Sequence, residues 1–305
     1  MKHTQPITII LLLSFLIAQF IGLAIVYQYI DNEQTTATGE VVFEEIPLIE
    51  RPPIEEKTSF LPIIITILIG TGIFFVLLKY NLLLVIRIWF LIALSLSLYV
   101  AFQAFIPTMI ALILAIGAAL WRIFKPNVWI QNLTELFIYG GLAAVFVPVF
   151  NLTSGVILLI LISCYDAYAV WKSKHMITLA KSQAKANVFA GLLIPYKINA
   201  KTKKNKIHGN KIQAKMQSPK MHHVPAKNIK TAILGGGDIA FPLIFAGIVM
   251  KEIGLWQSLI IPFFAAAALA LLFWKAEGNK FYPAMPFISA GCFIGLGVVW
   301  LFSLL

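Results

Sequence analysis

Two aspartates in otherwise apolar stretches are the residues best suited to do chemistry. Asp166 lies in the apolar run 153–172, and Asp238 lies in the run 231–250. A carboxylate at the centre of a membrane helix costs about 2.5–3.5 kcal/mol on insertion scales, so its presence indicates a function. Two carboxylates brought within about 3 Å share a proton, because both cannot ionise together. One can then activate a water molecule while the other polarises a peptide carbonyl, with no cofactor.

The positions of the two aspartates along their helices predict that they meet. Asp166 precedes Lys172 by six residues, which is roughly 9 Å of helix, and Asp238 follows Lys230 by eight, roughly 12 Å. The two runs are consecutive and therefore antiparallel, so both carboxylates are expected at a similar depth. Glu135 is the third acid within an apolar run, and we expect it to snorkel or to accept a hydrogen bond from a neighbour.

Glycines and a tyrosine surround the two acids. Gly235, Gly236 and Gly237 directly precede Asp238. Glycine allows close approach of helix backbones in membranes and permits unwinding where backbone lines a cavity. Plain helix packing would explain the glycines equally well. Tyr165 can donate a hydrogen bond to a carboxylate, or it can serve as an interfacial anchor.

A proline-containing segment begins the last apolar run. It reads Pro283-Ala284-Met285-Pro286 and lies at the same expected depth as the two aspartates. Two prolines three residues apart delay regular helix and leave N–H and carbonyl groups exposed. Such a segment could bind an extended substrate by main-chain hydrogen bonding. A simple proline-capped helix start is the alternative.

The elements that must position these residues are membrane helices. The chain has 305 residues, of which 60% are hydrophobic and 12% charged. Soluble domains are about 25% charged, so a soluble enzyme is excluded. Runs of roughly 20 apolar residues predict an all-α polytopic membrane protein with nine spans. The predicted spans are 6–29, 60–79, 83–104, 106–121, 128–150, 153–172, 231–250, 253–274 and 282–305.

The distribution of basic residues predicts the orientation. Of the 24 Lys and Arg residues, three (Arg51, Lys57 and Lys251) fall on one side of the predicted topology, which leaves 24 − 3 = 21 on the other. The positive-inside rule then places the N-terminus in the cytoplasm and the C-terminus outside. The two aspartates consequently lie toward the cytoplasmic side.

Three parts of the chain follow from this topology. Residues 1–172 hold spans one to six and an acidic external loop at 31–59, and residues 231–305 hold spans seven to nine. Between them, 173–230 is a basic cytoplasmic loop that we expect to be partly disordered and to contact anionic lipid headgroups. No aromatic interleaving supports nucleic-acid binding there. Its apolar stretch 186–196 is too short to span and is expected in the interface or in a cavity.

No metal or disulfide is expected. The two cysteines, Cys164 and Cys292, lie in apolar runs, and all five histidines lie outside such runs. These positions cannot supply a four-cysteine site or a histidine-ligated metal within the membrane.

Three motifs in order resemble one known family. Tyr165-Asp166, Gly235-Gly236-Gly237-Asp238 and Pro283-Ala284-Met285 look like the YD, GxGD and PAL motifs of presenilin and signal peptide peptidase, the intramembrane aspartyl proteases. The resemblance covers essentially the whole chain, and the compact size suggests an archaeal homologue. Met285 departs from the usual leucine but conserves apolar volume.

The resemblance implies the roles of these residues. Asp166 and Asp238 would be the catalytic pair, Gly235 and Gly237 would shape the site, and Pro283 to Met285 would support substrate docking. Substrates would be single-span membrane proteins or signal peptides, cleaved in the cell membrane if the source is prokaryotic. The resemblance assigns no accessory subunit to this chain.

Two alternatives share some of these features. Prepilin peptidases also carry a GxGD motif, but they have fewer spans and no PAL-type segment. Proton-coupled transporters and ion-leak channels also use paired intramembrane acids and broken helices. Against transport, no inverted repeat of spans is visible, and both acids lie away from the bilayer midplane.

Overall fold

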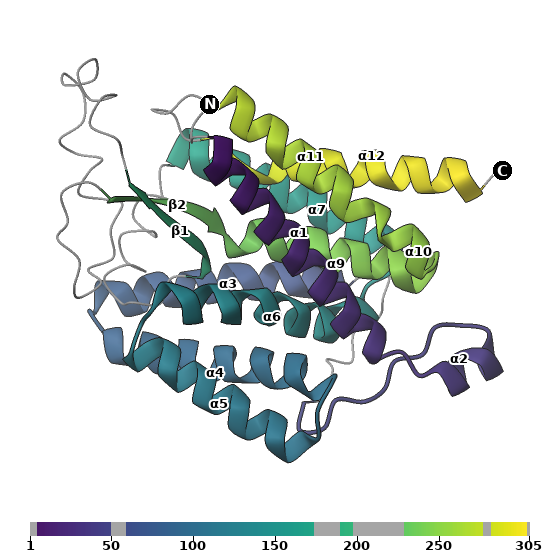
Figure 1. Ribbon diagram of the computed structural model, residues 1–305, viewed down its shortest axis with the longest axis horizontal. Coiled ribbons are helices and arrows are strands. Elements are labelled where there is room, and N and C mark those ends of the chain that lie inside the picture. Colours follow the sequence, from purple (N-terminus) through teal and green to yellow (C-terminus); the bar gives the residue numbers. More distant parts are fainter. Residues whose placement is uncertain (1–4, 50–58, 174–189, 198–228, 277–281, 304–305) are drawn as a thin grey trace.

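Helices make up most of the molecule. The computed structural model describes residues 5–49, 59–173, 190–197, 229–276 and 282–303. Figure 1 shows the long helices gathered into one bundle, with a two-stranded sheet at the end of the bundle opposite α2. That sheet departs from the all-α fold that the sequence predicts.

The helices match the predicted apolar runs in order. Their bounds are α1 Gln5–Gln28, α2 Asn32–Thr38, α3 Phe60–Lys79, α4 Leu83–Gln103, α5 Thr108–Phe124, α6 Val128–Phe146, the 3-10 turn Val147–Val149, α7 Leu152–Tyr168 with a π-helical end at Ala169–Ser173, α9 Gly236–Glu252, α10 Leu255–Ser258, α11 Ile260–Lys275 and α12 Met285–Ser303. Seven described helices are long and apolar enough to cross a membrane. α5 and α9 have 17 residues each, and the count of nine spans and their orientation stay predictions.

The segment before α9 corrects one predicted boundary. Residues 231–235 were expected to begin a membrane helix, but they belong to strand β2 (Ile229–Gly235), which pairs antiparallel with β1 (Gly191–Lys197). Helix α9 starts only at Gly236, because the backbone of Gly235 is still extended, with φ −65° and ψ 147°. Residues 191–196 of the predicted interfacial or cavity segment form β1, and residues 186–189 lie outside the described part, so its place in an interface or cavity stays a prediction.

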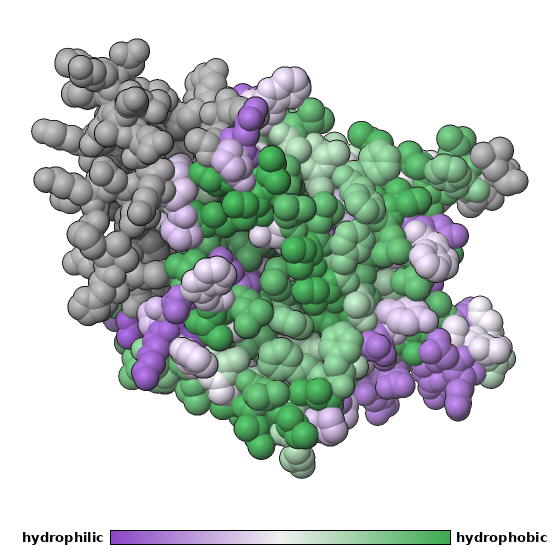
Figure 2. Space-filling view, in the orientation of Figure 1, coloured by the Kyte–Doolittle hydropathy of each residue, from purple (hydrophilic) through white to green (hydrophobic). Residues whose placement is uncertain are grey.

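Buried surface is concentrated on α9. Eleven of its 17 residues are buried, from Gly236 to Met250, whereas none of α3 is buried. α9 packs against α1, α6, α7, α11 and α12. Figure 2 shows apolar side chains over the bundle, and hydrophilic ones near α2. The bundle therefore encloses the helix that carries Asp238 and presents an apolar exterior suited to lipid.

Candidate active site

Asp166 lies in the last turn of α7 and contacts the start of α12. The Met285 N–H donates a hydrogen bond of 3.1 Å to Asp166 Oδ2. Met285 is the first residue of α12, and first-turn amides of a helix have no partner within that helix. The positive end of the helix dipole also favours a carboxylate there. The predicted broken segment thus holds Asp166 through a backbone amide that has no partner within the helix.

A serine pair forms a second link between the same helices. Ser163 Oγ donates to Ser289 Oγ at 2.8 Å, one turn from Asp166 and one turn from Met285. Ser289 is buried at 2% exposure. Two hydrogen bonds on neighbouring turns therefore fix the start of α12 relative to the end of α7. Sequence reasoning missed this pair because isolated serines in apolar helices carry no distinctive spacing.

Asp238 lies in the first turn of α9, directly after the strand pair. A Cβ atom added at Gly235 would come 3.2 Å from Asp238 Oδ2. On the following residue, the Ile239 carbonyl accepts a hydrogen bond of 2.9 Å from Nε2 of Gln19, which is fully buried on α1. Pro242 interrupts the backbone bonding of α9 at this point. Gln19 is a further residue near the site that the sequence motifs did not indicate.

A close contact between α7 and α9 sets the relative level of the two aspartates. A Cβ atom at Gly155 would meet Ile248 Cδ1 at 2.8 Å, so these two positions touch. Asp166 follows Gly155 by eleven residues, and Asp238 precedes Ile248 by ten. At 1.5 Å per residue in antiparallel helices, the two carboxylates differ in level by only about 1.5 Å. Figure 1 shows α7 and α9 running side by side.

The middle glycine of the motif has the tightest surroundings. A Cβ atom at Gly236 would lie 2.6 Å from the hydroxyl oxygen of Tyr139 on α6, whereas one at Gly237 would find its nearest neighbour, Phe241, at 3.5 Å. Packing against the Tyr139 side chain thus favours glycine at position 236, which is buried. Tyr139 in turn donates to Glu135, which confirms the prediction that Glu135 accepts a hydrogen bond from a neighbour.

The remaining predicted site residues flank this centre. Tyr165 is 47% exposed, and the described part of the chain contains no hydrogen-bond partner for its hydroxyl. Pro283 is buried, and Ala284 and Pro286 are partly buried on either side of Met285. A role for Tyr165 in binding the carboxylate stays a prediction.

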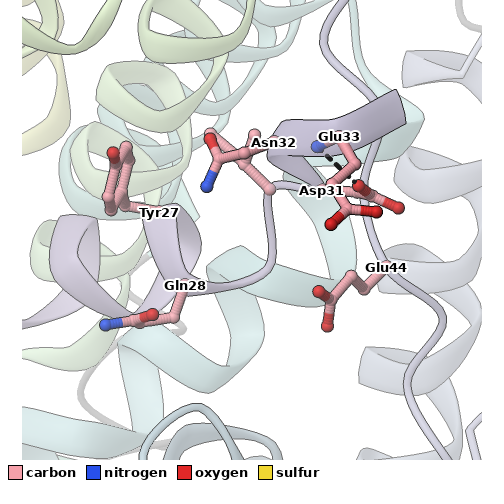
Figure 3. Close-up of a pocket in the computed structure, with 7 residues that line it drawn as sticks. Tyr27, Gln28, Asp31, Asn32, Glu33 and Glu44 are labelled. Carbon is pink, nitrogen blue, oxygen red and sulfur yellow. Dashed lines mark hydrogen bonds between the residues drawn. The ribbon is translucent and has the colours of Figure 1, made fainter. Parts of the chain in front are cut away.

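One polar cavity lies at the far end of α1. Its volume is about 470 Å³, and Figure 3 shows its acidic lining. The lining residues are Tyr27, Gln28, Ile30, Asp31, Asn32, Glu33 and Glu44. Asp31 already accepts the amide of Glu33 and caps α2. The cavity contains neither predicted aspartate and belongs to the acidic loop.

The described residues offer no cluster of metal-binding side chains. No group of three or more His, Cys, Asp or Glu side chains there could hold an ion. Cys164 is exposed and Cys292 is buried, and both are free thiols.

Comparison with known proteins identifies the family. The family described as signal-peptide peptidase, presenilin aspartyl protease matches residues 40–304. Among solved structures, a presenilin-family intramembrane aspartate protease in space group C222 aligns with a TM-score of 0.58 at 17% identity, covering 95% of this chain and 99% of that one. A second, in space group P2, aligns with a TM-score of 0.57 at 18% identity, covering 96% of each. A search of curated proteins found no match. The chain therefore belongs to the signal-peptide peptidase and presenilin family of aspartyl proteases, and it is an aspartic-type intramembrane endopeptidase.

Proposed function

We propose that Asp166 and Asp238 form the catalytic dyad and hydrolyse peptide bonds within transmembrane-helix substrates. The observation that carries the proposal is the shared level of the two residues on packed helices, given by the Gly155–Ile248 contact. The Met285 amide on Asp166 supports it, because that bond orients one carboxylate at the junction of α7 and α12. Preorganised carboxylates of this kind need no reorientation during the reaction.

The reaction balances with one water molecule. The ionised carboxylate of the pair removes a proton from water, and the water oxygen bonds to the peptide carbonyl carbon. The protonated carboxyl gives its proton to the carbonyl oxygen, which yields a tetrahedral diol. Collapse of the diol breaks the C–N bond, and a proton passes to the leaving nitrogen. Because the two groups titrate as a pair, we assign the acid and base roles to the dyad as a whole.

The strand pair offers a docking edge for the unwound substrate. On the outer edge of β1, Leu193 exchanges two hydrogen bonds with the Asn132 amide (2.9 and 2.8 Å). The Gly191 carbonyl is bonded to Gln131, and Pro195 has no N–H. The outer edge of β1 is thus occupied by side chains of α6.

β2 therefore has the available edge. Leu193 pairs with Ile233. The N–H and C=O groups of Leu193 point away from β2, so in this non-hydrogen-bonded pair the N–H and C=O groups of Ile233 point away from β1. Among the described residues Ile233 has no hydrogen bond on that side. An extended substrate added there would run toward Asp238 within a few residues. This arrangement leaves segment 282–286 to hold Asp166.

Substrate class and location follow from the same proposal. We infer that substrates are single-span membrane proteins or signal peptides and that cleavage occurs near the cytoplasmic face. We also propose that the Lys-rich segment 173–230, most of which lies outside the described residues, contacts anionic headgroups on that side. Transport by paired acids is the rival, and family membership favours proteolysis over it.

A cleavage assay tests the dyad. The purified protein in detergent should cut a single-span peptide, and Asp166→Asn and Asp238→Asn should each abolish cutting. Glu33→Gln, which removes a carboxylate from the distant cavity, serves as the matched control and should cut normally. Normal cleavage by both aspartate variants would rule out the dyad. A proton flux into liposomes that depends on Asp166, with no cleavage by the wild type, would favour transport.

A further inference from the structure

A buried ion pair lies beside the proposed dyad but outside it. Arg122, at the end of α5, forms a salt bridge with Glu135 on α6, at 5% and 1% side-chain exposure. Arg122 Nη1 also donates to Thr134 Oγ1 at 2.9 Å, and its guanidinium lies over the Phe90 ring, 5.5 Å from the centroid. The second carboxylate oxygen of Glu135 accepts a hydrogen bond from Tyr139.

Stability alone does not explain this pair. Desolvating two charges offsets much of their attraction, and apolar residues of similar volume often stabilise a protein as well. One established use of such groups is to fix one geometry among several. The question is then which group the pair holds in place.

Tyr139 connects the ion pair to the glycine motif. It stands four residues after Glu135, so both side chains share one face of α6. Its hydroxyl donates to Glu135 on one side and lies where a Cβ of Gly236 would come within 2.6 Å on the other. The path from Arg122 to the motif is thus continuous and buried.

The glycine motif needs outside support. Gly235, Gly236 and Gly237 have no side chains with which to lock the turn before Asp238, and glycine has the largest conformational freedom of any residue. The ring of Tyr139 supplies a fixed surface against this turn only while its hydroxyl is held. The hydrogen bond from Tyr139 to Glu135, itself held by Arg122, meets that need.

We propose that Arg122, Glu135 and Tyr139 form a positioning chain that sets the Gly235–Gly237 turn and so directs the Asp238 carboxyl toward Asp166. These residues act through Asp238 and do not touch the substrate. The proposal rests on the proposed dyad. Neither the ion pair nor the tyrosine belongs to the three sequence motifs.

The test compares the hydroxyls of two tyrosines with buried side chains. Tyr139→Phe removes the one beside the motif, and Tyr99→Phe removes one on α4 that donates to the Pro47 carbonyl at 2.9 Å. The side chain of Tyr99 is also buried, at 1% exposure against 3% for Tyr139, although its hydrogen bond to Pro47 is only partly buried. Rates of peptide cleavage are measured in detergent, corrected for the folded fraction, and separated into kcat and KM. Tyr139→Phe should lower kcat about tenfold or more while KM changes little, because a misplaced catalytic group slows chemistry more than binding.

A double variant checks that the effect passes through Gly236. Gly236→Ala alone drives a Cβ into the Tyr139 hydroxyl, and Tyr139→Phe removes that oxygen, leaving ring carbons at 3.1 and 3.2 Å. The double variant should therefore be no slower than Gly236→Ala.

Three results would overturn the inference. The first is a wild-type kcat in Tyr139→Phe. The second is a loss of kcat in the double variant that equals the product of the losses in Tyr139→Phe and Gly236→Ala. Asp166→Asn is run in parallel. If it is inactive while Tyr139→Phe is normal, only the positioning chain fails; if it cleaves normally, the dyad and the chain fail together.

Discussion

Glu135 and Asp166 are both carboxylates within apolar helices, but their surroundings differ. Glu135 is 1% exposed and is held by Arg122 and Tyr139. Asp166 is partly exposed and accepts the amide of Met285 at 3.1 Å, with no cation paired to it in the described residues. One acid is enclosed with an opposite charge, and the other lies where the end of α7 meets the start of α12.

This contrast is the one expected between a structural acid and the reactive acid that we propose. A buried acid whose two carboxylate oxygens are held by an arginine and a tyrosine is poorly placed to activate water. A proteolytic acid must exchange protons and admit water, so it cannot be fully paired. The apolar context alone, which is common to both, does not distinguish the two roles.

The largest expected effect is on catalysis by the dyad. Asp166→Asn or Asp238→Asn should each slow cleavage by about 1000-fold or more, since both lose general acid–base catalysis. The double variant should be no slower than either single one, because residues that act as a unit are non-additive. Initial rates at matched enzyme concentration measure this. If the rate losses of the two single variants multiply in the double variant, the two aspartates act independently. Asp166 would then not differ from Glu135 by membership of a dyad.

The next effect is on stability, where substitution of Glu135 should have a larger effect than substitution of Asp166. Glu135→Ala should lower the free energy of unfolding by about 3–5 kcal/mol, because it leaves Arg122 buried and unpaired. Asp166→Asn should change it by less than about 1 kcal/mol. Denaturant titrations in detergent, followed by tryptophan fluorescence, measure both. Arg122→Met combined with Glu135→Leu should regain part of the loss; equal destabilisation by Glu135→Ala and Asp166→Asn would contradict the comparison.

Two glycines of one motif should differ in their tolerance of alanine. Gly236→Ala meets the Tyr139 hydroxyl at 2.6 Å, whereas Gly237→Ala finds nothing nearer than 3.5 Å. We expect about a 100-fold loss of kcat in the first and a clearly smaller loss in the second. Cleavage rates per folded molecule decide the ranking. The opposite order would mean that backbone freedom at 237 matters more than packing at 236.

The sequence predicts the helices well because apolar runs are continuous. The predicted span 60–79 matches α3, and the other described spans shift by a few residues. The strand pair was missed because a short apolar run does not distinguish a strand from a buried helix. The pairing also joins residues 191–197 to 229–235, which are so far apart in the sequence that no short turn motif between them predicts a hairpin.

The site was predictable only where motifs report it. Asp166, Asp238 and Met285 were chosen from their positions, and the structure brings Met285 to Asp166. From the sequence, Arg122 was interpreted only as one of the basic residues that indicate the orientation in the membrane. Its partner Glu135 is on another helix, so the pair depends on the packing of α5 against α6 and no spacing reveals it.

The smallest expected effect concerns the link between α7 and α12. Ser289→Ala removes the hydrogen bond to Ser163, and one such bond contributes about 1 kcal/mol. Ser258→Ala is the matched control, because Ser258 is fully buried and donates to the Leu255 carbonyl away from the dyad. Both variants should lose similar stability, but only Ser289→Ala should lower kcat, by about fivefold, if the start of α12 orients Asp166. Equal kcat in the two variants would mean that the Met285 amide holds Asp166 without the serine pair, and the reactive acid would then depend on fewer neighbours than Glu135 does.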